Sequence, residues 1–384
     1  MPPSDAAGTA PAPGLYERWL EGFEVLAEET FAQLEQLALR GPRPLALARW
    51  LRLIGERRPP RWASEHRIVF ESPLARLRDF SPPGARAAQL PVLVLPPQAG
   101  HDSCIVDYSP TQSQMRTIVA AGLERAYALD WVGATQRTAN ASIEDYLEVV
   151  DDAVARLGGR VNLIGDCQGG WLATIYAALE PAHVNTLTIA GAPVDFHAGE
   201  PVIGELLRLL APRGDLRFYE RLVAAGGGVL PGRQMLGGFL AINPADEIAR
   251  QLSLLRNLDD PEHVARYQEF EDWFKHTQDI PGAFYLWIVR HLFRDNELIR
   301  GELEIGGRTV DLKALRMPLA LLAGRDDHIT PPPQVFALAR FASTPEELVT
   351  RELASGGHLG LFMGREALAR HWPPILARIA RHSE

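Results

Sequence analysis

The sequence predicts an α/β fold in which a mostly parallel sheet has helices on both faces and a helical cap is inserted into it. From about residue 65 onward, short and nearly continuous apolar runs alternate with amphipathic runs of helical period, a pattern typical of parallel strands that are buried on both faces. The alternation stops near Phe196, and a buried strand pattern returns only at 317–327. We therefore expect one sheet domain built from two separate parts of the chain.

The N-terminal part of the chain precedes the sheet. Residues 1–14 are rich in Pro, Ala and Gly and are expected to form a disordered tail. Residues 15–64 are expected to form an N-terminal helical region, because apolar residues recur at helical spacing over 14–40 and again over 43–56.

The sheet domain is expected over 65–198 and 313–384. Its strands are predicted, in chain order, at 66–72, 75–80, 90–97, 125–131, 160–166, 185–194, 317–327 and 346–354. Helices are predicted between and after these strands at 110–122, 142–159, 169–181 and 365–383. Connections between parallel strands are right-handed, which restricts the topology further.

Residues 199–312 are expected to form the cap insertion, because this block is helical, irregular and rich in aromatic residues. Five of its side chains could line a tunnel for a bulky apolar acyl group: Phe284, Tyr285, Trp287, His291 and Phe293. The spacing of Tyr285, Trp287 and Phe293 is, however, more typical of one helix face packed in a core. Both interpretations remain open at this point.

Composition argues against several classes of function. A net charge of −9 is unfavourable for a nucleic-acid or anionic-membrane surface. Two cysteines cannot form a disulfide framework, no basic and apolar leader pattern opens the chain, and no apolar run approaches about eighteen residues. We therefore expect a cytoplasmic protein without a transmembrane segment. The histidines lack paired-ligand spacing and no phosphate-binding glycine loop is present, so we expect no metal and no cofactor.

A nucleophile motif joins the strand at 160–166 to the helix that follows. Gly165-Asp166-Cys167-Gln168-Gly169 has the G-x-nucleophile-x-G spacing of a sharp strand-to-helix turn, with Cys where Ser is usual. The glycines are needed because such a turn brings backbone segments very close together. The N-terminus of the following helix favours a thiolate. The alternative is a buried cysteine that only packs, which is the role we expect for the other cysteine, Cys104.

The order of later residues supports a catalytic role for Cys167. In the α/β-hydrolase fold, the nucleophile is followed in the chain by an acid after a late strand and by a histidine after the last strand. Here Asp326 and Asp327 follow the strand at 317–327, and His358 follows the last strand. An ordinary polar turn and a loop histidine are the alternatives, but all three features occur in the required order.

The roles of these residues follow from acid–base chemistry. His358 would take the proton of Cys167, and the acid would fix the tautomer of the histidine. The backbone N–H of Gln168 should form half of an oxyanion hole, and the loop around Gln98 or Ala99 should supply the other half. A thiolate suits acyl groups that arrive as thioesters, because sulfur exchanges acyl with sulfur at little energetic cost.

The segments around these positions closely resemble the polyhydroxyalkanoate (PHA) synthases, which are members of the α/β-hydrolase superfamily with a Cys nucleophile. The matching segments include "GDCQGG", "LTIAGAPVDF", "SGGHLG" and the run over 279–332 that contains "NELIRGELEIGGRTVDLKALRMPLALLAGRDDHITPP". The resemblance extends over roughly 90–360. It implies that Cys167 is the acyl-bearing nucleophile, Asp327 the catalytic acid and His358 the base, with Asp326 as the second candidate for the acid.

One loop departs from the pattern of that family. PHA synthases tend to have a "PP-W-I-N-K"-like stretch where this chain has "PPQAGHDSC" at 96–104. The change places an extra imidazole, His101, near the expected site, although a loop histidine facing water is an equal alternative. The family's Asp-Trp pair appears here as Asp130-Trp131. The candidate substrate-binding residues are therefore the following: His101, Trp131, Trp171 and Trp287.

The resemblance implies an acyltransferase that takes 3-hydroxyacyl groups from coenzyme A (CoA) thioesters into a polyester through a Cys-His-Asp triad, with CoA thioester as substrate. The alternative is a hydrolase of the same fold, such as an intracellular polyester depolymerase, a thioesterase or an esterase. A third interpretation, a non-catalytic relative that binds a granule or a partner, is disfavoured by the intact Cys, Asp and His. The expected partners are acyl-CoA or polyester, a second copy of the chain or a second synthase subunit, and the surface of a polyester granule in the cytoplasm.

Overall fold

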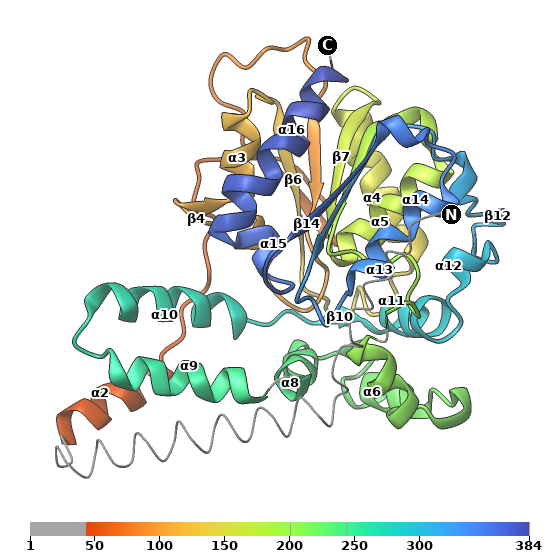
Figure 1. Ribbon diagram of the computed structural model, residues 1–384. Coiled ribbons are helices and arrows are strands. Elements are labelled where there is room, and N and C mark those ends of the chain that lie inside the picture. Colours follow the sequence, from red (N-terminus) through yellow and green to blue (C-terminus); the bar gives the residue numbers. More distant parts are fainter. Residues whose placement is uncertain (1–43, 200, 243, 384) are drawn as a thin grey trace, which may run out of the picture.

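The computed structural model describes residues 44–199, 201–242 and 244–383. The expected tail at 1–14 and the helix expected at 14–40 lie outside the described residues. Within the expected N-terminal helical region, α2 (Pro44–Gly55) corresponds to the helix predicted at 43–56. This helix packs against α9 (Pro244–Arg256), at a distance from the sheet (Figure 1).

An eight-stranded sheet forms the centre of the protein, in the order β1-β2-β6-β3-β7-β8-β13-β14. The strands are β1 (Arg67–Glu71), β2 (Ala75–Asp79), β3 (Val92–Leu95), β6 (Ala126–Trp131), β7 (Val161–Asp166), β8 (Val184–Ala190), β13 (Leu319–Gly324) and β14 (Val349–Ala354). Strand β2 pairs antiparallel with both β1 and β6, and the strands β6, β3, β7, β8, β13 and β14 are parallel to one another. This mostly parallel sheet with crossovers is that of an α/β hydrolase, and the predicted fold class is confirmed.

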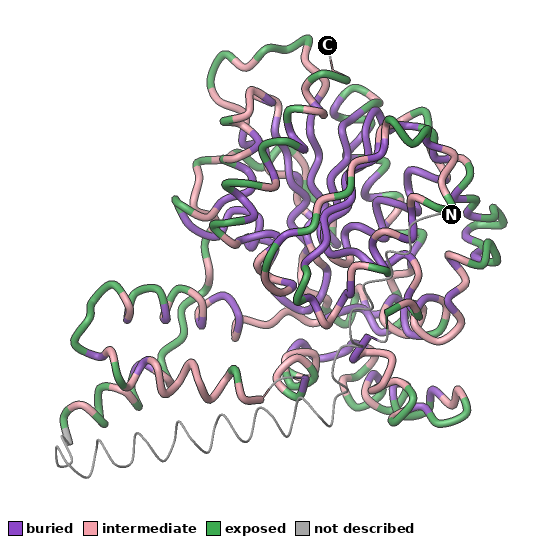
Figure 2. The backbone as a smooth tube through the Cα atoms, viewed as in Figure 1, coloured by how far each residue is buried: buried purple, intermediate pink, exposed green. Residues whose placement is uncertain are grey.

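Both faces of the sheet are covered by helices, and every position of the central strands is buried. In β3, Leu93 and Leu95 belong to one core cluster, whereas Val92 and Val94 belong to the other. The first cluster packs under α4 (Ile143–Arg156) and α5 (Gln168–Leu179), and the second under α3 (Gln114–Ala120) and α16 (Trp372–Arg381). Figure 1 shows these two pairs of helices on opposite sides of the strands, which are almost wholly buried in Figure 2.

A helical insertion lies between β8 and β13. It contains α6 (Val202–Leu210), α7 (Arg217–Ala225), α8 (Gly232–Ile242), α9, α10 (Pro261–Phe274), α11 (Gly282–Trp287) and α12 (Glu297–Arg300), and a two-stranded pairing of β9 (Val229–Leu230) with β10 (Ile280–Pro281). In Figure 1, α6, α8, α9 and α10 form a layer along one end of the sheet. In Figure 2 much of this layer is intermediate or exposed, whereas the strands of the sheet are buried.

Several predicted elements are shorter in the structure than in the sequence analysis. The helix predicted at 110–122 begins only at Gln114, because residues 107–113 form a small hairpin of β4 (Asp107–Ser109) and β5 (Gln112–Ser113). The last strand begins only at Val349. The last helix, α16, begins only at Trp372 and is preceded by a π-helical segment over Ala367–His371. These differences lie at element ends, where capping and tertiary contacts decide the boundary.

Candidate active site

Cys167 occupies the sharp turn between β7 and α5. Its backbone has φ of 52° and ψ of −117°, a left-handed conformation that is strained for a residue other than glycine. The strained turn is held by two backbone hydrogen bonds: the Cys167 N–H donates to the Ala190 carbonyl at 2.8 Å, and the Gly170 N–H donates to the Cys167 carbonyl at 2.9 Å. The thiol is therefore held at the carboxyl end of the sheet, at the start of a helix.

The glycines around the nucleophile are required by close approach of the backbone. A Cβ added to Gly165 would lie 2.4 Å from the Gly169 carbonyl oxygen, and one added to Gly169 would lie 1.9 Å from the carbonyl oxygen of Leu95 in β3. A Cβ on Gly170 would lie 2.3 Å from the Ala192 side chain. Only glycine fits at these positions, which explains the spacing of the motif.

A histidine and a carboxylate from two later strand ends meet next to this turn. The Nδ1 atom of His358, after β14, lies 2.7 Å from Oδ2 of Asp327, after β13, and both side chains are buried. The other oxygen of Asp327, Oδ1, accepts the backbone N–H groups of Ile329 at 3.0 Å and Thr330 at 2.8 Å. The carboxylate is thus fixed from behind and presents one oxygen to the imidazole.

Asp326, the second candidate for the acid, points elsewhere. Its side chain is exposed, and its Oδ2 accepts the backbone N–H of Gly356 at 3.3 Å. The geometry therefore pairs His358 with Asp327, the residue that the resemblance to PHA synthases implied.

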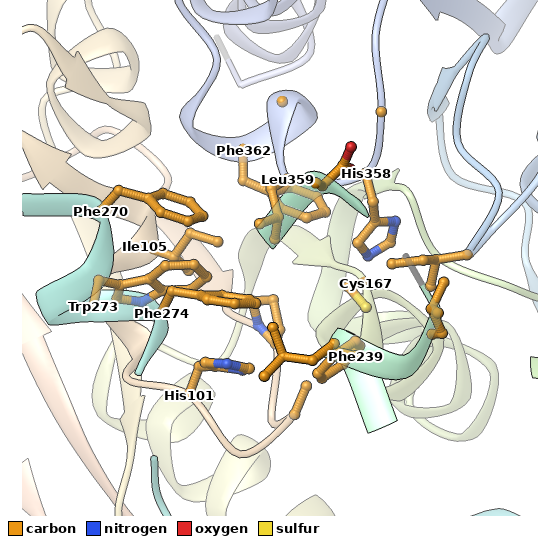
Figure 3. Close-up of a pocket in the computed structure, with 18 of the residues that line it drawn as sticks. His101, Ile105, Cys167, Phe239, Phe270, Trp273, Phe274, His358, Leu359 and Phe362 are labelled. Atoms are coloured by element: carbon orange, nitrogen blue, oxygen red, sulfur yellow. The ribbon is translucent and has the colours of Figure 1, made fainter. Parts of the chain in front are cut away.

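The environment of His358 favours the protonated ring. Burial alone lowers its pKa, but the negative charges of Asp327 and Cys167 outweigh burial and raise this pKa well above its ordinary value. Figure 3 shows the imidazole of His358 above the sulfur of Cys167. The imidazole is therefore placed to exchange a proton with the Cys167 sulfur.

The nucleophile opens into a cavity of about 310 Å³ that lies between the sheet and the insertion. Its lining is largely apolar and comes from the sheet domain and from α8, α9 and α10. It includes Ala99, Ile105, Phe239, Phe270, Trp273, Phe274, Leu359 and Phe362 (Figure 3). A small-molecule site of this kind is typically apolar with a few fixed polar groups. The polar groups here include Cys167, His358 and His101.

His101 belongs to this cavity and does not face water. Its ring stacks on Phe274, with a centroid distance of 5.4 Å, and on Trp273 at 5.2 Å. Burial lowers the pKa of His101 to about 4, although the backbone carbonyls of Ala99 and Phe274 favour the protonated ring. His101 is therefore a neutral imidazole at physiological pH.

The loop that carries His101 is anchored to the insertion by hydrogen bonds that its main-chain carbonyl groups accept. The Gln278 N–H donates to the Gly100 carbonyl at 2.8 Å, and the Trp273 indole N–H donates to the Asp102 carbonyl at 2.9 Å. A β-bridge pairs His101 with Thr277. The loop in which this chain departs from PHA synthases and the insertion thus form one continuous wall.

The two residues expected to supply the second oxyanion donor are placed differently. Ala99 lines the cavity. The side chain of Gln98 is buried instead, and its amide donates to the hydroxyl of Tyr146 at 3.0 Å, so that it anchors the loop to α4. That the backbone N–H groups of Gln168 and of this loop form the oxyanion hole stays a prediction, which rests on their position in the fold.

Of the three tryptophans expected to contact substrate, Trp131 and Trp171 are packed in the core and Trp287 is half-buried. The indole N–H of Trp131 donates to the Pro96 carbonyl at 2.8 Å, and the residue is 1% exposed. Trp171 is equally buried and packs against Phe284 and Trp287, with a centroid distance of 6.2 Å to the latter. As far as the structure describes it, the cavity lining includes none of the three. Contact of these tryptophans with substrate therefore stays a prediction.

Sequence reasoning missed the wall opposite the nucleophile. Phe270, Trp273 and Phe274 in α10 line the cavity together with Phe239 of α8. The spacing of Phe270, Trp273 and Phe274 is i, i+3, i+4, which places them on one helix face. That signal was present in the sequence, but it did not show which surface the face would cover.

Asp166, between the strand and the nucleophile, is a buried carboxyl that sequence reasoning did not single out. Its Oδ1 accepts the Gln114 side-chain amide at 3.3 Å, and its Oδ2 has no hydrogen-bond partner among the described residues. Burial raises its pKa from 3.8 to about 8. The group is therefore largely protonated at neutral pH.

Within residues 44–383, apart from positions 200 and 243, no three side chains of the types His, Cys, Asp and Glu gather as a metal site would require. In the same residues, every helix is too short or too polar to span a bilayer.

Proteins with a known name are similar to this chain over most of its length. It is 27% identical over 315 residues to a protein from Allochromatium vinosum named poly(3-hydroxyalkanoate) polymerase subunit PhaC, covering 80% of this chain and 86% of that one. A protein of the same name from Haloferax mediterranei is 27% identical over 294 residues, which cover 73% of this chain and 56% of the relative. The resemblance to PHA synthases is thereby confirmed as a similarity.

A solved carboxylesterase structure from Nitrososphaera gargenis matches 81% of this chain and 98% of its own, with a TM-score of 0.48 and 15% identity. A family model covers most of the chain, from residue 72 to residue 374, and includes the turn at Cys167, the insertion, Asp327 and His358. The chain therefore belongs to the family described as protein of unknown function, DUF3141.

Proposed function

We propose that the protein is an acyltransferase of the PHA synthase type, which takes 3-hydroxyacyl groups from CoA thioesters and adds them to a polyester. The observation that carries the proposal is the geometry of Cys167, His358 and Asp327: a thiol on a strained turn, an imidazole above it and a buried carboxylate behind the imidazole. The sequence similarity to proteins named poly(3-hydroxyalkanoate) polymerase supports the choice of reaction.

The first half-reaction transfers the acyl group to the protein. The Cys167 thiolate attacks the thioester carbonyl, and the resulting oxyanion is stabilised by the backbone N–H of Gln168 and by a second N–H near Ala99. The carbon–sulfur bond to CoA then breaks, and the CoA thiolate takes the proton held on His358 Nε2. CoA leaves as a thiol, and a thioester to Cys167 remains.

The second half-reaction transfers the acyl group to an alcohol. Neutral His358 accepts the proton of the hydroxyl at a chain end as its oxygen attacks the acyl-cysteine carbonyl. The bond to Cys167 breaks, an ester forms, and the thiolate is regenerated beside the imidazolium. Asp327 Oδ2 keeps the proton on Nδ1 throughout, so that Nε2 always faces the reaction.

Water is the competing acceptor, and the cavity is suited to exclude it. Aromatic and aliphatic side chains of α8 and α10 cover the nucleophile, and the Asp and Arg side chains of the described lining are limited to Asp102, Asp246 and Arg250. A hydrolase of the same fold would need a water molecule at the place that the proposal gives to the chain-end hydroxyl.

One experiment separates these outcomes. Pure protein is incubated with 3-hydroxybutyryl-CoA, and free thiol is followed together with the acyl product. The proposal predicts thiol release with polymer. Thiol release with free 3-hydroxybutyrate would indicate a thioesterase, and soluble products from polymer granules without thiol release from CoA would indicate a depolymerase.

A further inference from the structure

A second cavity, of about 420 Å³, lies within the insertion and reaches Gln168, the residue after the nucleophile. Its walls come from α6, α7, α8, α11 and the helical turn after α11, and most of its lining is aliphatic or aromatic, including Leu206, Leu222, Met235, Tyr285, Ile288 and Phe293. Tyr285 and Phe293, for which the sequence left tunnel and core interpretations open, therefore face this cavity.

The second cavity adjoins the one that contains Cys167. Phe239 and Ile242 of α8 line both cavities. Cys167 lines the first, and the next residue in the chain, Gln168, lines the second. The side chains of Phe239 and Ile242 thus form a partition at the point where an acyl group bound to Cys167 would begin.

Two amide groups in the second cavity have unused hydrogen-bonding capacity. The Oε1 atoms of Gln168 and Gln234 are both buried, and neither has a hydrogen-bond partner among the residues that the structure describes. Unsatisfied buried polar atoms are uncommon in proteins and indicate a missing partner. Because each amide offers both an acceptor and a donor, the two together suit a hydroxyl group, which donates one hydrogen bond and accepts another.

The size of the cavity decides the length of the group that it can hold. A water molecule occupies about 30 Å³ of liquid volume, and a methylene group is of similar size. A cavity of about 420 Å³ then accommodates on the order of ten carbon-sized groups, once imperfect filling is allowed for. This is much more than the four carbons of a hydroxybutyryl group require.

We infer that the second cavity receives the alkyl tail of a 3-hydroxyacyl group of medium length carried by Cys167, and that the side chains of Gln168 and Gln234 bind its 3-hydroxyl group. The identity of the ligand as an acyl group rests on the proposed function. The first cavity is then left open for the incoming acceptor, and the chain that has been loaded is held apart from it by Phe239.

Two neighbouring glycines of α8 provide a matched pair of variants. A Cβ added to Gly238, which lines the cavity, or to Gly237, which does not, would have no heavy atom within 4 Å. Gly238→Leu therefore adds an apolar side chain to the cavity lining without a backbone clash, and Gly237→Leu is a control of the same chemistry on the same helix. Both changes raise helix propensity equally.

The test is calorimetric binding of free acids, which does not depend on turnover. Each buried methylene strengthens binding roughly fourfold, so wild-type protein should bind 3-hydroxydecanoate at least about a hundredfold more tightly than 3-hydroxybutyrate. Gly238→Leu should weaken the binding of 3-hydroxydecanoate at least about tenfold, and Gly237→Leu should change it less than about twofold. Gln234→Leu should reduce the preference for 3-hydroxydecanoate over decanoate about fivefold, through loss of one hydrogen bond.

Equal binding of the short and long acids to wild-type protein would overturn the inference, and this comparison needs no variant. Equal effects of Gly238→Leu and Gly237→Leu, with both proteins showing a cooperative thermal transition, would overturn it as well. Thiol release from 3-hydroxyacyl-CoA is measured separately. Tight, Gly238-dependent binding without any thiol release supports the cavity and contradicts the proposed function, whereas thiol release without chain-length dependence does the reverse.

Discussion

Replacing Asp327 by Asn tests the geometry behind His358 with almost no change in shape. In the wild-type protein Oδ1 of Asp327 accepts two backbone N–H groups, from Ile329 and Thr330, and Oδ2 faces His358 Nδ1 at 2.7 Å. Asparagine has one oxygen, and the two backbone donors require it. The amide NH₂ group must then point at Nδ1, which becomes a hydrogen-bond acceptor.

The consequence is a change of tautomer. With Nδ1 unprotonated, the ring proton moves to Nε2, and the imidazole can no longer take a proton from Cys167 or from the acceptor hydroxyl. A carboxylate-to-amide change of this kind in a catalytic triad lowers kcat by about 10⁴, which corresponds to a barrier higher by about 5 kcal/mol. Asp326→Asn, on the exposed neighbour that bonds Gly356 N–H, is the matched control and should cost less than about threefold.

The assay is the initial rate of thiol release from 3-hydroxybutyryl-CoA by the wild-type protein and the two variants, with unfolding by urea as the check on folding. A rate for Asp327→Asn within tenfold of wild type would refute the reasoning about the tautomer. A larger loss from Asp326→Asn than from Asp327→Asn would reassign the acid.

Three further predictions follow from the turn at Cys167. Cys167→Ala should abolish thiol release and Cys167→Ser should leave a much weaker activity, because serine lacks a thiolate; a wild-type rate in Cys167→Ala would exclude the site. Gly169→Ala should lower the free energy of unfolding by about 3 kcal/mol or more, because its Cβ would lie 1.9 Å from the Leu95 carbonyl, whereas Gly237→Ala should not destabilise in urea titrations. Burial raises the pKa of Asp166 from 3.8 to about 8, so between about pH 4 and pH 8 the folded state keeps a proton that the unfolded state loses. The free energy of unfolding of the wild-type protein should therefore fall relative to that of Asp166→Asn as pH rises from about 4 to 8. A difference in unfolding free energy between the two proteins that stays the same at pH 5 and pH 8 would contradict this.

The sequence was sufficient for the features that depend on local chain geometry. The turn at Cys167 could be predicted because its glycines are required by the local approach of one strand and one helix. The sheet could be predicted because short apolar runs that alternate with amphipathic helices indicate buried strands. The order of nucleophile, acid and histidine then located Asp327 and His358. The choice between Asp327 and its neighbour needed the structure or a resemblance, because adjacent carboxylates in a turn differ only in direction.

The rest of the site depends on tertiary packing that no local pattern reports. The helix face with Phe270, Trp273 and Phe274 covers the nucleophile only because α10 folds back over the end of the sheet. Trp131 and Trp171, which were expected at the site, are buried in the core. A tryptophan beside a motif has the same sequence signature in a core and in a substrate site. The neutral state of His101 follows from aromatic neighbours more than 130 residues away.

Capture of the acyl-enzyme tests the central claim most directly. Protein is mixed with 3-hydroxybutyryl-CoA, quenched in acid within one turnover, digested, and analysed by mass spectrometry for the acyl adduct. The account predicts that the adduct is on Cys167, that it is absent from the buried Cys104, whose pKa burial raises well above its ordinary value, and that Cys167→Ala releases no CoA thiol. Continued thiol release by Cys167→Ala, or an adduct on any other residue, would contradict it.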